Sequence, residues 1–236
     1  VLFARRSVQV VVREFQRNGG ELILGRAEAP AAIATASSIK VGPREVKAAN
    51  FVFACGPWLG KVFPDVLGDR IFPTRQEVYY FGVPQGDSRF QSSALPVWAD
   101  FTEEMYGIPD FRGRGFKVAL DRHGPVIDPD SMERVPTPAT MEHVREFVRR
   151  RFPALGRMPI VHAEVCQYEN TSNGDFLVDR HPDLANVWLV GGGSGHGFKH
   201  GPAMGEYVAA RIADGKPPDA RFSLATKEKV QQRTVF

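Results

Sequence analysis

The sequence predicts an α/β fold in which one layer of strands and helices is interrupted by an inserted α+β domain with a mixed sheet. Two continuous apolar runs, at residues 51–54 and 187–190, are typical of strands in a sheet that is covered on both faces. Each run is followed by a glycine-containing turn and the start of a helical pattern, as in an α/β layer. Between them, from about residue 70, prolines separate short aromatic-rich runs, which predict an antiparallel or mixed sheet.

The composition is that of an ordinary globular chain. Of its 236 residues, 43% are hydrophobic and 24% are charged, which allows a sizeable core. No apolar run approaches the roughly 20 residues that span a bilayer, and no signal peptide opens the chain, so we expect no membrane partner. The formal charge of +3 could favour a nucleic-acid binder, but no basic stripe interleaves with aromatic residues, so we expect no nucleic-acid partner.

Cysteine usage excludes two further classes. Cys55 and Cys166 are the two cysteines of the sequence, too few for a disulfide scaffold or a cysteine metal site. We therefore expect no metal site and a cytoplasmic location.

The first part of the layer is expected over residues 1–70. Within it we predict, in order, a helix, a short strand, a hairpin or small meander, and a second strand, at residues 6–18, 21–24, 26–50 and 51–54. The helix is predicted because apolar residues recur at helical spacing before Gly19-Gly20, which would end it. After the second strand, Cys55-Gly56-Pro57-Trp58 predicts a tight turn into a helix. This turn either presents backbone to a ligand or is ordinary packing between a strand and a helix.

The inserted domain is expected over residues 71–160. Its helix is predicted at 137–151, where Thr137-Pro138 opens a pattern of apolar residues at helical spacing. Lys117 is unusual because it is a single cation within a strand of Phe, Val, Ala and Leu. It either extends to water from the edge of the sheet or points into a cleft as a charge held for chemistry.

Residues 161–215 return to the first layer. Strands are predicted at 163–168, 176–179 and 187–190, with a helix at 206–214 that Gly215 closes. Six of the eleven residues from Gly191 to Gly201 are glycine, so backbone amides and a helix N-terminus can approach a ligand closely there. Residues 216–236 are polar and without periodicity, and they predict a surface tail.

Four motifs in this order are familiar from known flavoenzymes. They are Cys166-Gln167-Tyr168-Glu169-Asn170-Thr171, Phe176-Leu177-Val178-Asp179-Arg180-His181-Pro182, Asn186-Val187, and Gly193-Ser194-Gly195-His196-Gly197-Phe198-Lys199. With them the chain resembles the C-terminal part of the D-amino-acid-oxidase superfamily, on its sarcosine-oxidase-like branch. The resemblance covers nearly the whole chain, since Ala54-Cys55-Gly56-Pro57-Trp58 is similar to a family turn and Lys117 falls at a family lysine.

The resemblance implies a flavin-binding, Rossmann-like layer at 1–70 and 161–215, with a substrate-binding domain at 71–160. FAD is the implied cofactor, attached covalently through Cys166; a buried, inert cysteine is the alternative. The implied cofactor-binding residues are Cys166, Ala54, Gly56, Trp58, Gly193, Ser194, Gly195, His196, Gly197, Phe198 and Lys199.

The resemblance also implies catalytic roles. Lys199 would pair with a substrate carboxylate, and Lys117 would activate dioxygen as a cation beside the reduced flavin. Tyr168 would line the substrate pocket, and His196 would orient the loop or touch the flavin rather than act as a base. We expect Cys166, Lys117 and Lys199 to converge on one pocket.

The implied activity is FAD-dependent oxidation of the C–N bond of a small amine or amino acid, with dioxygen reoxidising the flavin to give hydrogen peroxide. A dehydrogenase with another acceptor is an alternative. The family's G-x-G-x-x-G fingerprint is absent from the sequence, so a truncated, non-catalytic fragment is a second alternative. The residues that follow Lys117, Asp121-Arg122-His123, do not match the histidine found there in sarcosine oxidase, so the resemblance does not specify the substrate.

Overall fold

The computed structural model describes residues 2–31 and 34–232 of the chain. Val1, two residues of the expected hairpin segment (32–33) and the last four of the expected tail (233–236) lie outside the described residues. The chain divides into two compact units, an inserted unit of residues 73–168 and an interrupted unit of residues 2–72 and 169–232. Within the described residues, none of the helices combines the length and the apolar character that crossing a bilayer needs.

The interrupted unit contains short helices and two small sheets. Its elements before the insertion are α1 (Ala4–Arg17), β1 (Ser38–Val41), β2 (Arg44–Lys47), β3 (Phe51–Phe53), η1 (Gly56–Trp58), α2 (Leu59–Val62) and α3 (Pro64–Leu67). Those after it are β9 (Leu177–His181), β10 (Leu184–Gly191), η4 (Gly197–His200), α5 (Gly201–Asp214), η5 (Ala220–Phe222) and η6 (Leu224–Thr226).

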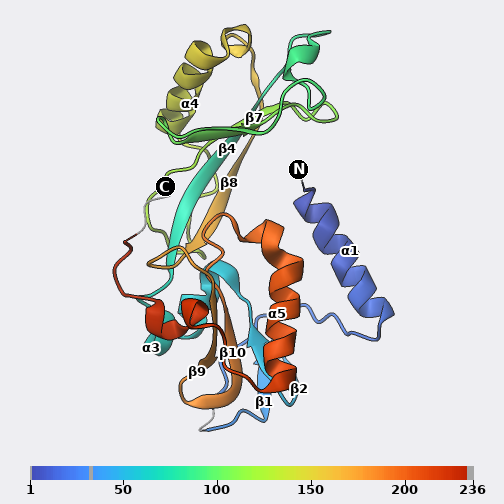
Figure 1. The fold of residues 1–236 in the computed structure, drawn as a ribbon, viewed down its shortest axis with the longest axis vertical. Helices are drawn as coiled ribbons and strands as arrows, with labels where there is room; N and C mark the ends of the chain where they lie inside the picture. The colour runs from blue at the N-terminus through green and yellow to red at the C-terminus, as the bar shows by residue number, and fades with distance from the viewer. Residues whose placement is uncertain (1, 32–33, 233–236) are drawn as a thin grey trace. The chain divides into compact units, whose positions relative to one another are not determined.

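The central sheet of this unit has the order β3-β10-β9 (Figure 1). β10 runs parallel to β3 and antiparallel to β9, so the two apolar runs of the sequence are neighbours, with Trp188 opposite Val52. Phe51 and Phe53 are buried on one face of β3, whereas Val52 on the other face is 46% exposed. The prediction that both faces of this strand are covered is therefore wrong for β3.

Caps and turns explain why several predicted elements are confirmed. Helix α5 ends at Gly215, whose φ of 65° is the left-handed conformation that glycine adopts without strain. The hairpin of β1 and β2 turns at Gly42, with a φ of 57°. Helix α1 forms where it is predicted, but none of its residues is buried, and Val11 is 64% exposed.

The strand predicted at residues 21–24 is not formed. Backbone pairing begins later, where the N–H of Glu28 bonds the carbonyl of Lys40 and the N–H of Gly42 bonds that of Arg26. Leu24 is 89% exposed, so a short run of apolar residues did not by itself provide a strand partner.

The segment after α5 differs from the surface tail expected of it. Lys227 is fully buried, and its Nζ donates to the carbonyl of Arg221 at 3.0 Å. Its backbone carbonyl accepts from the guanidinium of Arg70, and Leu224 packs against the core of the interrupted unit. The hydrogen bonds of this buried lysine fix the segment, and a hydropathy pattern does not reveal them.

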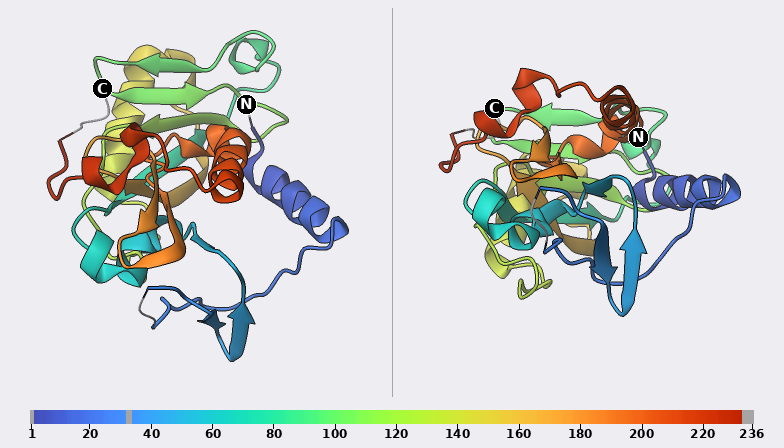
Figure 2. Two further views of the ribbon diagram at one scale, coloured as in Figure 1. Left: turned by 60° about the horizontal axis from the view of Figure 1, so that its bottom comes forward. Right: turned by 90° about the horizontal axis from the view of Figure 1, so that it is seen from below.

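The inserted unit combines a five-stranded sheet with the helix α4 (Pro138–Arg151). Its elements are β4 (Phe72–Phe81), η2 (Ser88–Phe90), β5 (Trp98–Asp100), β6 (Met105–Ile108), β7 (Phe116–Leu120), α4 (Pro138–Arg151), η3 (Pro153–Leu155) and β8 (Ile160–Asn170). The strand order is β5-β6-β7-β4-β8, and β7 is antiparallel to both β6 and β4. α4 lies along one face of these strands (Figures 1 and 2).

The core of the inserted unit lies between this helix and the sheet. Phe147 and Val148 of α4 are buried with Phe116 and Val118 of β7, and the ring of Trp98 stacks against Phe147. The helix begins as predicted, because the hydroxyl of Thr137 accepts from the N–H of Thr140. Side chains alternate between the two faces of β7, and Phe116 and Val118 face α4, so Lys117 faces away from it.

Candidate functional site

The glycine-rich loop follows β10 and has a fixed path. Gly192 and Gly195 have positive φ angles of 71° and 78°, and so does Ser194, at 43°. Ser194 is held in this uncommon conformation because its N–H donates to the carbonyl of Glu169 at 2.8 Å and its hydroxyl to that of Gly192 at 3.2 Å. A side chain at position 192 would meet the carbonyl oxygen of Asp175 at 2.9 Å, so glycine is required there.

His196 ties this loop to the turn before β9. Its Nε2 lies 3.2 Å from the carbonyl oxygen of Gly174, and its ring packs edge-on against Phe176 with centroids 5.6 Å apart. The backbone N–H of His196 donates to the carbonyl of Gly193 at 2.9 Å. These contacts suit the loop-orienting role that the resemblance implies; its catalytic role stays a prediction.

Lys199 and Phe198 lie in η4, just before α5, and both are exposed on the interrupted unit. Since Lys117 and Cys166 belong to the other unit, the expected convergence of these three residues stays a prediction.

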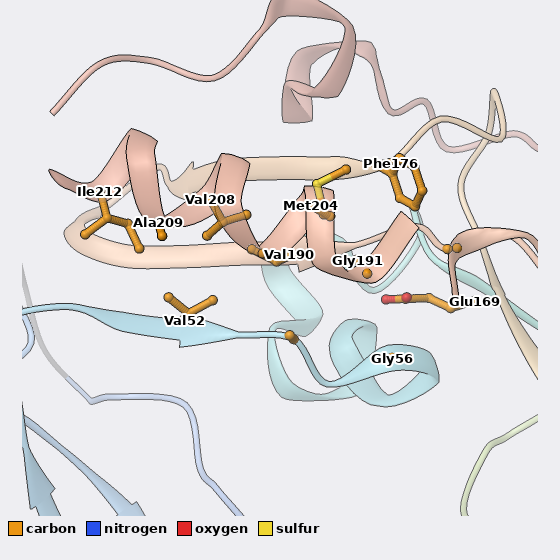
Figure 3. A pocket seen from close by; sticks show the side chains of 15 residues that line it. Val52, Gly56, Glu169, Phe176, Val190, Gly191, Met204, Val208, Ala209 and Ile212 are labelled. Atoms are coloured by element: carbon orange, nitrogen blue, oxygen red, sulfur yellow. The ribbon is translucent and has the colours of Figure 1, made fainter. Parts of the chain in front are cut away.

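An apolar cavity of about 570 Å³ lies beside the loop, within the interrupted unit. Figure 3 shows it between α5 and β3, with Val52 on one side and Val208 and Ile212 on the other. Of the cofactor-binding residues expected from the sequence, it is lined by Ala54, Gly56, Gly193 and Gly197. Trp58, Ser194, Gly195, His196, Phe198 and Lys199 are not among the described residues that line it.

One wall of the cavity is bare backbone. Gly197, Gly201 and Gly205 line it at a spacing of four residues, so they share one side of η4 and α5. A Cβ atom at Gly201 or Gly205 would meet nothing within 4 Å and would occupy free space beside the cavity. This wall includes the N-terminus of α5 at Gly201. The free amides at a helix N-terminus can donate hydrogen bonds to acceptor atoms of a ligand and stabilise negative charge.

Glu169 is a site residue that the sequence analysis missed. Among the described residues that line the cavity, it alone carries a titratable side chain, and it is 9% exposed. Its Oε1 has no hydrogen-bond partner. Burial raises the pKa of Glu169 to about 7, although the backbone N–H groups of Gly193 and Gly192 act in the opposite direction. A glutamate at the end of a strand carries no sequence signal that separates it from a surface residue.

The inserted unit places three predicted residues on the sheet face opposite α4. We call Tyr106, Lys117, Cys166 and Tyr168 the open face of the inserted sheet. The Nζ of Lys117 lies 5.1 Å from the ring centroid of Tyr106, and Tyr106 is hydrogen-bonded to Tyr168. Burial raises the pKa of Tyr168 far above its ordinary value, so its hydroxyl is neutral.

Lys117 lies on an interior strand, with Ile108 of β6 and Tyr80 of β4 directly opposite it. The reading of Lys117 as an edge-strand lysine is therefore wrong. Burial raises the pKa of the Cys166 thiol, while the charge of Lys117 acts against that rise. Lys117 and Cys166 therefore interact within one unit.

Two further residues reach this face from the turn after β7. The ring of His123 lies edge-on to Tyr168 with centroids 6.4 Å apart, and the charge of Asp121 contributes to the raised pKa of Tyr168. Tyr106 and His123 were not singled out from the sequence. Alternation along β6 could have assigned Tyr106 to the face of Lys117, but only once the two strands were known to pair.

Known proteins that are similar to this chain indicate its family. The family model described as FAD dependent oxidoreductase matches residues 1–211. Monomeric sarcosine oxidase of Bacillus sp. (strain NS-129) is 29% identical over 185 residues, 76% of this chain and 47% of that protein. Human peroxisomal sarcosine oxidase is 30% identical over 72% of this chain and 45% of its own length. N-methyl-L-tryptophan oxidase of Salmonella arizonae is also 30% identical, over 77% of this chain and 48% of its own.

Solved structures give the same fold. Fructosyl peptide oxidase from E. terrenum superposes with a TM-score of 0.82 at 16% identity, over 97% of this chain and 59% of that one. Amadoriase II from Aspergillus fumigatus, in complex with FSA, superposes with a TM-score of 0.78 at 20% identity, over 98% of this chain and 56% of that one. The chain spans about half the length of the curated relatives it matches. It belongs to the DAO family of FAD-dependent oxidoreductases.

Proposed function

We propose that this protein oxidises the C–N bond of a small amine or amino acid, with FAD as its cofactor and dioxygen as the acceptor. The observation that carries the proposal is the position of Lys117, a cation on an interior strand beside Tyr106 and Cys166. A lysine there, away from the sheet edge, is a charge held at a defined place beside aromatic rings and a thiol.

The residues of the interrupted unit suit FAD. The glycine wall leaves room for a flat ring, and the buried Oε1 of Glu169 lacks a partner that a bound molecule could supply. Gly193 and Gly197 would lie along the cofactor, with the N-terminal amides of α5 near its acceptor atoms. When bound, FAD supplies the two-electron acceptor for the amine.

The protein's own groups then have separate tasks. Tyr168 and Tyr106 would bound the substrate pocket. Each phenol has one O–H and the two hydroxyls are hydrogen-bonded to each other, so one O–H of the pair would be left to donate to the amine or its carboxylate. Lys199, exposed beside α5, would pair with a substrate carboxylate. Lys117 would hold a positive charge where dioxygen is reduced and so stabilise the negative charge that develops.

Cys166 is the proposed attachment point of the flavin. Its thiol is half-buried on the open face, near the charge of Lys117. The charge of Lys117 favours the thiolate, which is the reactive form, but burial and Glu164 outweigh it and the pKa of the thiol stays raised. The proposal also keeps the cytoplasmic location predicted from the sequence.

The names of the relatives supply the substrates for the test. The FAD-loaded protein is assayed with sarcosine, N-methyl-L-tryptophan and a fructosyl amine, and hydrogen peroxide is measured. We expect peroxide from at least one of them. We expect Lys117→Met to slow reoxidation by dioxygen by about 10²–10³-fold, the usual cost of removing a group that stabilises developing charge.

The control separates an oxidase from a dehydrogenase. Reduction of the flavin by the amine, followed without oxygen, should change much less in Lys117→Met than reoxidation does. Turnover with an artificial acceptor but none with dioxygen, in the wild type, would instead support a dehydrogenase.

A further inference from the structure

We propose that Glu169 is a ligand-recognition residue of the cavity in the interrupted unit, where its protonated carboxyl donates a hydrogen bond to an acceptor atom of a planar nitrogen heterocycle of FAD. The inference rests on the proposed function, because FAD is the ligand it names. It deepens that proposal by assigning a role to a residue outside the glycine loop and outside the open face of the inserted sheet.

The geometry leaves one oxygen of this carboxyl for a ligand. Glu169 is nine-tenths buried, and its Oε1 has no partner, whereas the N–H groups of Gly193 and Gly192 bond to the carboxyl. Figure 3 shows the carboxyl pointing past Gly191 toward the cavity. A buried polar atom without a hydrogen-bond partner costs free energy. A ligand atom that forms this hydrogen bond removes that cost, which favours binding.

The rest of the cavity suits a flat, largely apolar ring. Val52, Val190 and Val208 form its sides, and the glycines of η4 and α5 form a wall without side chains. A site with apolar walls and one polar group orients a ring by one hydrogen bond. Both the flavin and the adenine of FAD are such rings, with carbonyl oxygens or ring nitrogens as acceptors.

The protonation state decides which ligand fits. The neighbours of the carboxyl are Cys55 before η1, Gly191 of β10, and the amides of the glycine loop. Among these described neighbours only the thiol of Cys55 titrates. Burial and the nearby charge of Glu169 raise its pKa, so it stays neutral. No cation among them stabilises an ionised Glu169, which favours the acid form and an acceptor on the ligand.

The sign of the pH dependence follows. A ligand that accepts a hydrogen bond from the protonated carboxyl raises the pKa of Glu169 further, so binding is strongest below pH 7. Above pH 7 the carboxyl must take up a proton on binding, and the affinity then falls toward about tenfold per pH unit. An ammonium ligand would produce the opposite slope.

The experiment measures FAD affinity of the apoprotein from pH 5.5 to 8.5 by quenching of flavin fluorescence. Glu169→Gln keeps a hydrogen-bond donor and cannot ionise, so it should bind like the wild type at pH 6 and lose the decline at high pH. Glu169→Leu should bind roughly tenfold more weakly at pH 6, the value of one hydrogen bond. Glu206→Gln, an exposed change on α5, should leave the wild-type profile unchanged.

Infrared spectroscopy gives a readout that does not depend on activity. The ligand-free wild type should show one protonated-carboxyl band at pH 6 that disappears at pH 8. Glu169→Gln should lack this band at both pH values. FAD should preserve that band at pH 8. Thermal unfolding of each variant confirms that it is folded before binding is compared.

The outcomes separate the two proposals. Equal FAD affinity in the wild type and Glu169→Leu at every pH, or tighter binding at high pH, overturns the role of Glu169 and leaves the proposed function intact. A folded wild type that binds no FAD at any pH contradicts both. FMN and ADP are titrated as separate probes. The probe whose affinity shows the same Glu169-dependent change with pH identifies the ring that Glu169 contacts. If neither probe shows this pH dependence, the proposal is overturned.

Discussion

Lys117 illustrates how strand pairing excludes one of the two interpretations of a side chain. The sequence singles it out because it is a cation among apolar neighbours, but it leaves open whether the side chain reaches water or a cleft. The pairing of β7 between β6 and β4 excludes extension from a sheet edge, since an interior strand has no edge from which a lysine can extend. The pattern therefore identified the residue, and the topology gave its surroundings.

Glu169 shows what composition cannot reveal. A glutamate is usually exposed, and nothing in Tyr168-Glu169-Asn170 marks this one as buried. Its carboxyl lies against Gly191 and near the loop amides of Gly192 and Gly193, which follow more than 20 residues later in the chain. Tyr106 was missed for the same reason, because its neighbours come from other strands.

Cys166 provides a prediction at the scale of one atom. If its sulfur holds the flavin, yellow colour should stay with the acid-precipitated protein in the wild type and pass to the supernatant in Cys166→Ser. Cys55→Ser is the matched control, since this second half-buried thiol lies in the interrupted unit and should not affect retention. Colour that is released equally from all three proteins would leave Cys166 as an inert buried thiol.

At the scale of elements, local signals predicted helices better than strands. α4 forms as predicted and α5 ends as predicted, because these limits are set within the chain, by Thr137 at the start of one and Gly215 at the end of the other. The start of α5 was predicted wrongly, since the helix begins at Gly201 and not at Glu206. The strand expected at 21–24 fails because a strand needs a partner, which the local pattern does not specify. The buried Lys227 was missed because its hydrogen bonds determine its burial.

The glycine wall of α5 allows a prediction for this element. Gly205→Ala should raise the stability of the cofactor-free protein by about 0.5–1 kcal/mol, because alanine favours helix and its Cβ meets nothing within 4 Å. The same substitution should weaken FAD binding, because the methyl group occupies part of the cavity wall. Denaturant unfolding and FAD titration measure the two effects.

A matched change on the same helix controls for helix propensity. Ala203→Gly, at an exposed position of α5, should lower stability by a similar amount and leave FAD binding unchanged. If Gly205→Ala binds FAD as tightly as the wild type, the glycine wall is not part of the cofactor site.

At the scale of the whole molecule, the account requires both units to serve one reaction. The interrupted unit supplies an apolar, glycine-walled cavity with one carboxyl, and the inserted unit supplies a lysine, two tyrosines and a thiol on its open face. The sequence predicted the α/β class and the residues of each part by resemblance. Which residues meet across the chain depends on strand pairing and packing, which spacing does not show.

The most direct test of the central claim is the visible spectrum of the FAD-loaded protein under nitrogen, recorded before and after a secondary amine is added. The account predicts that the flavin band bleaches with the amine and returns, with hydrogen peroxide, when oxygen is admitted. A flavin band that no amine of the panel changes, in a protein that holds FAD, would contradict the account.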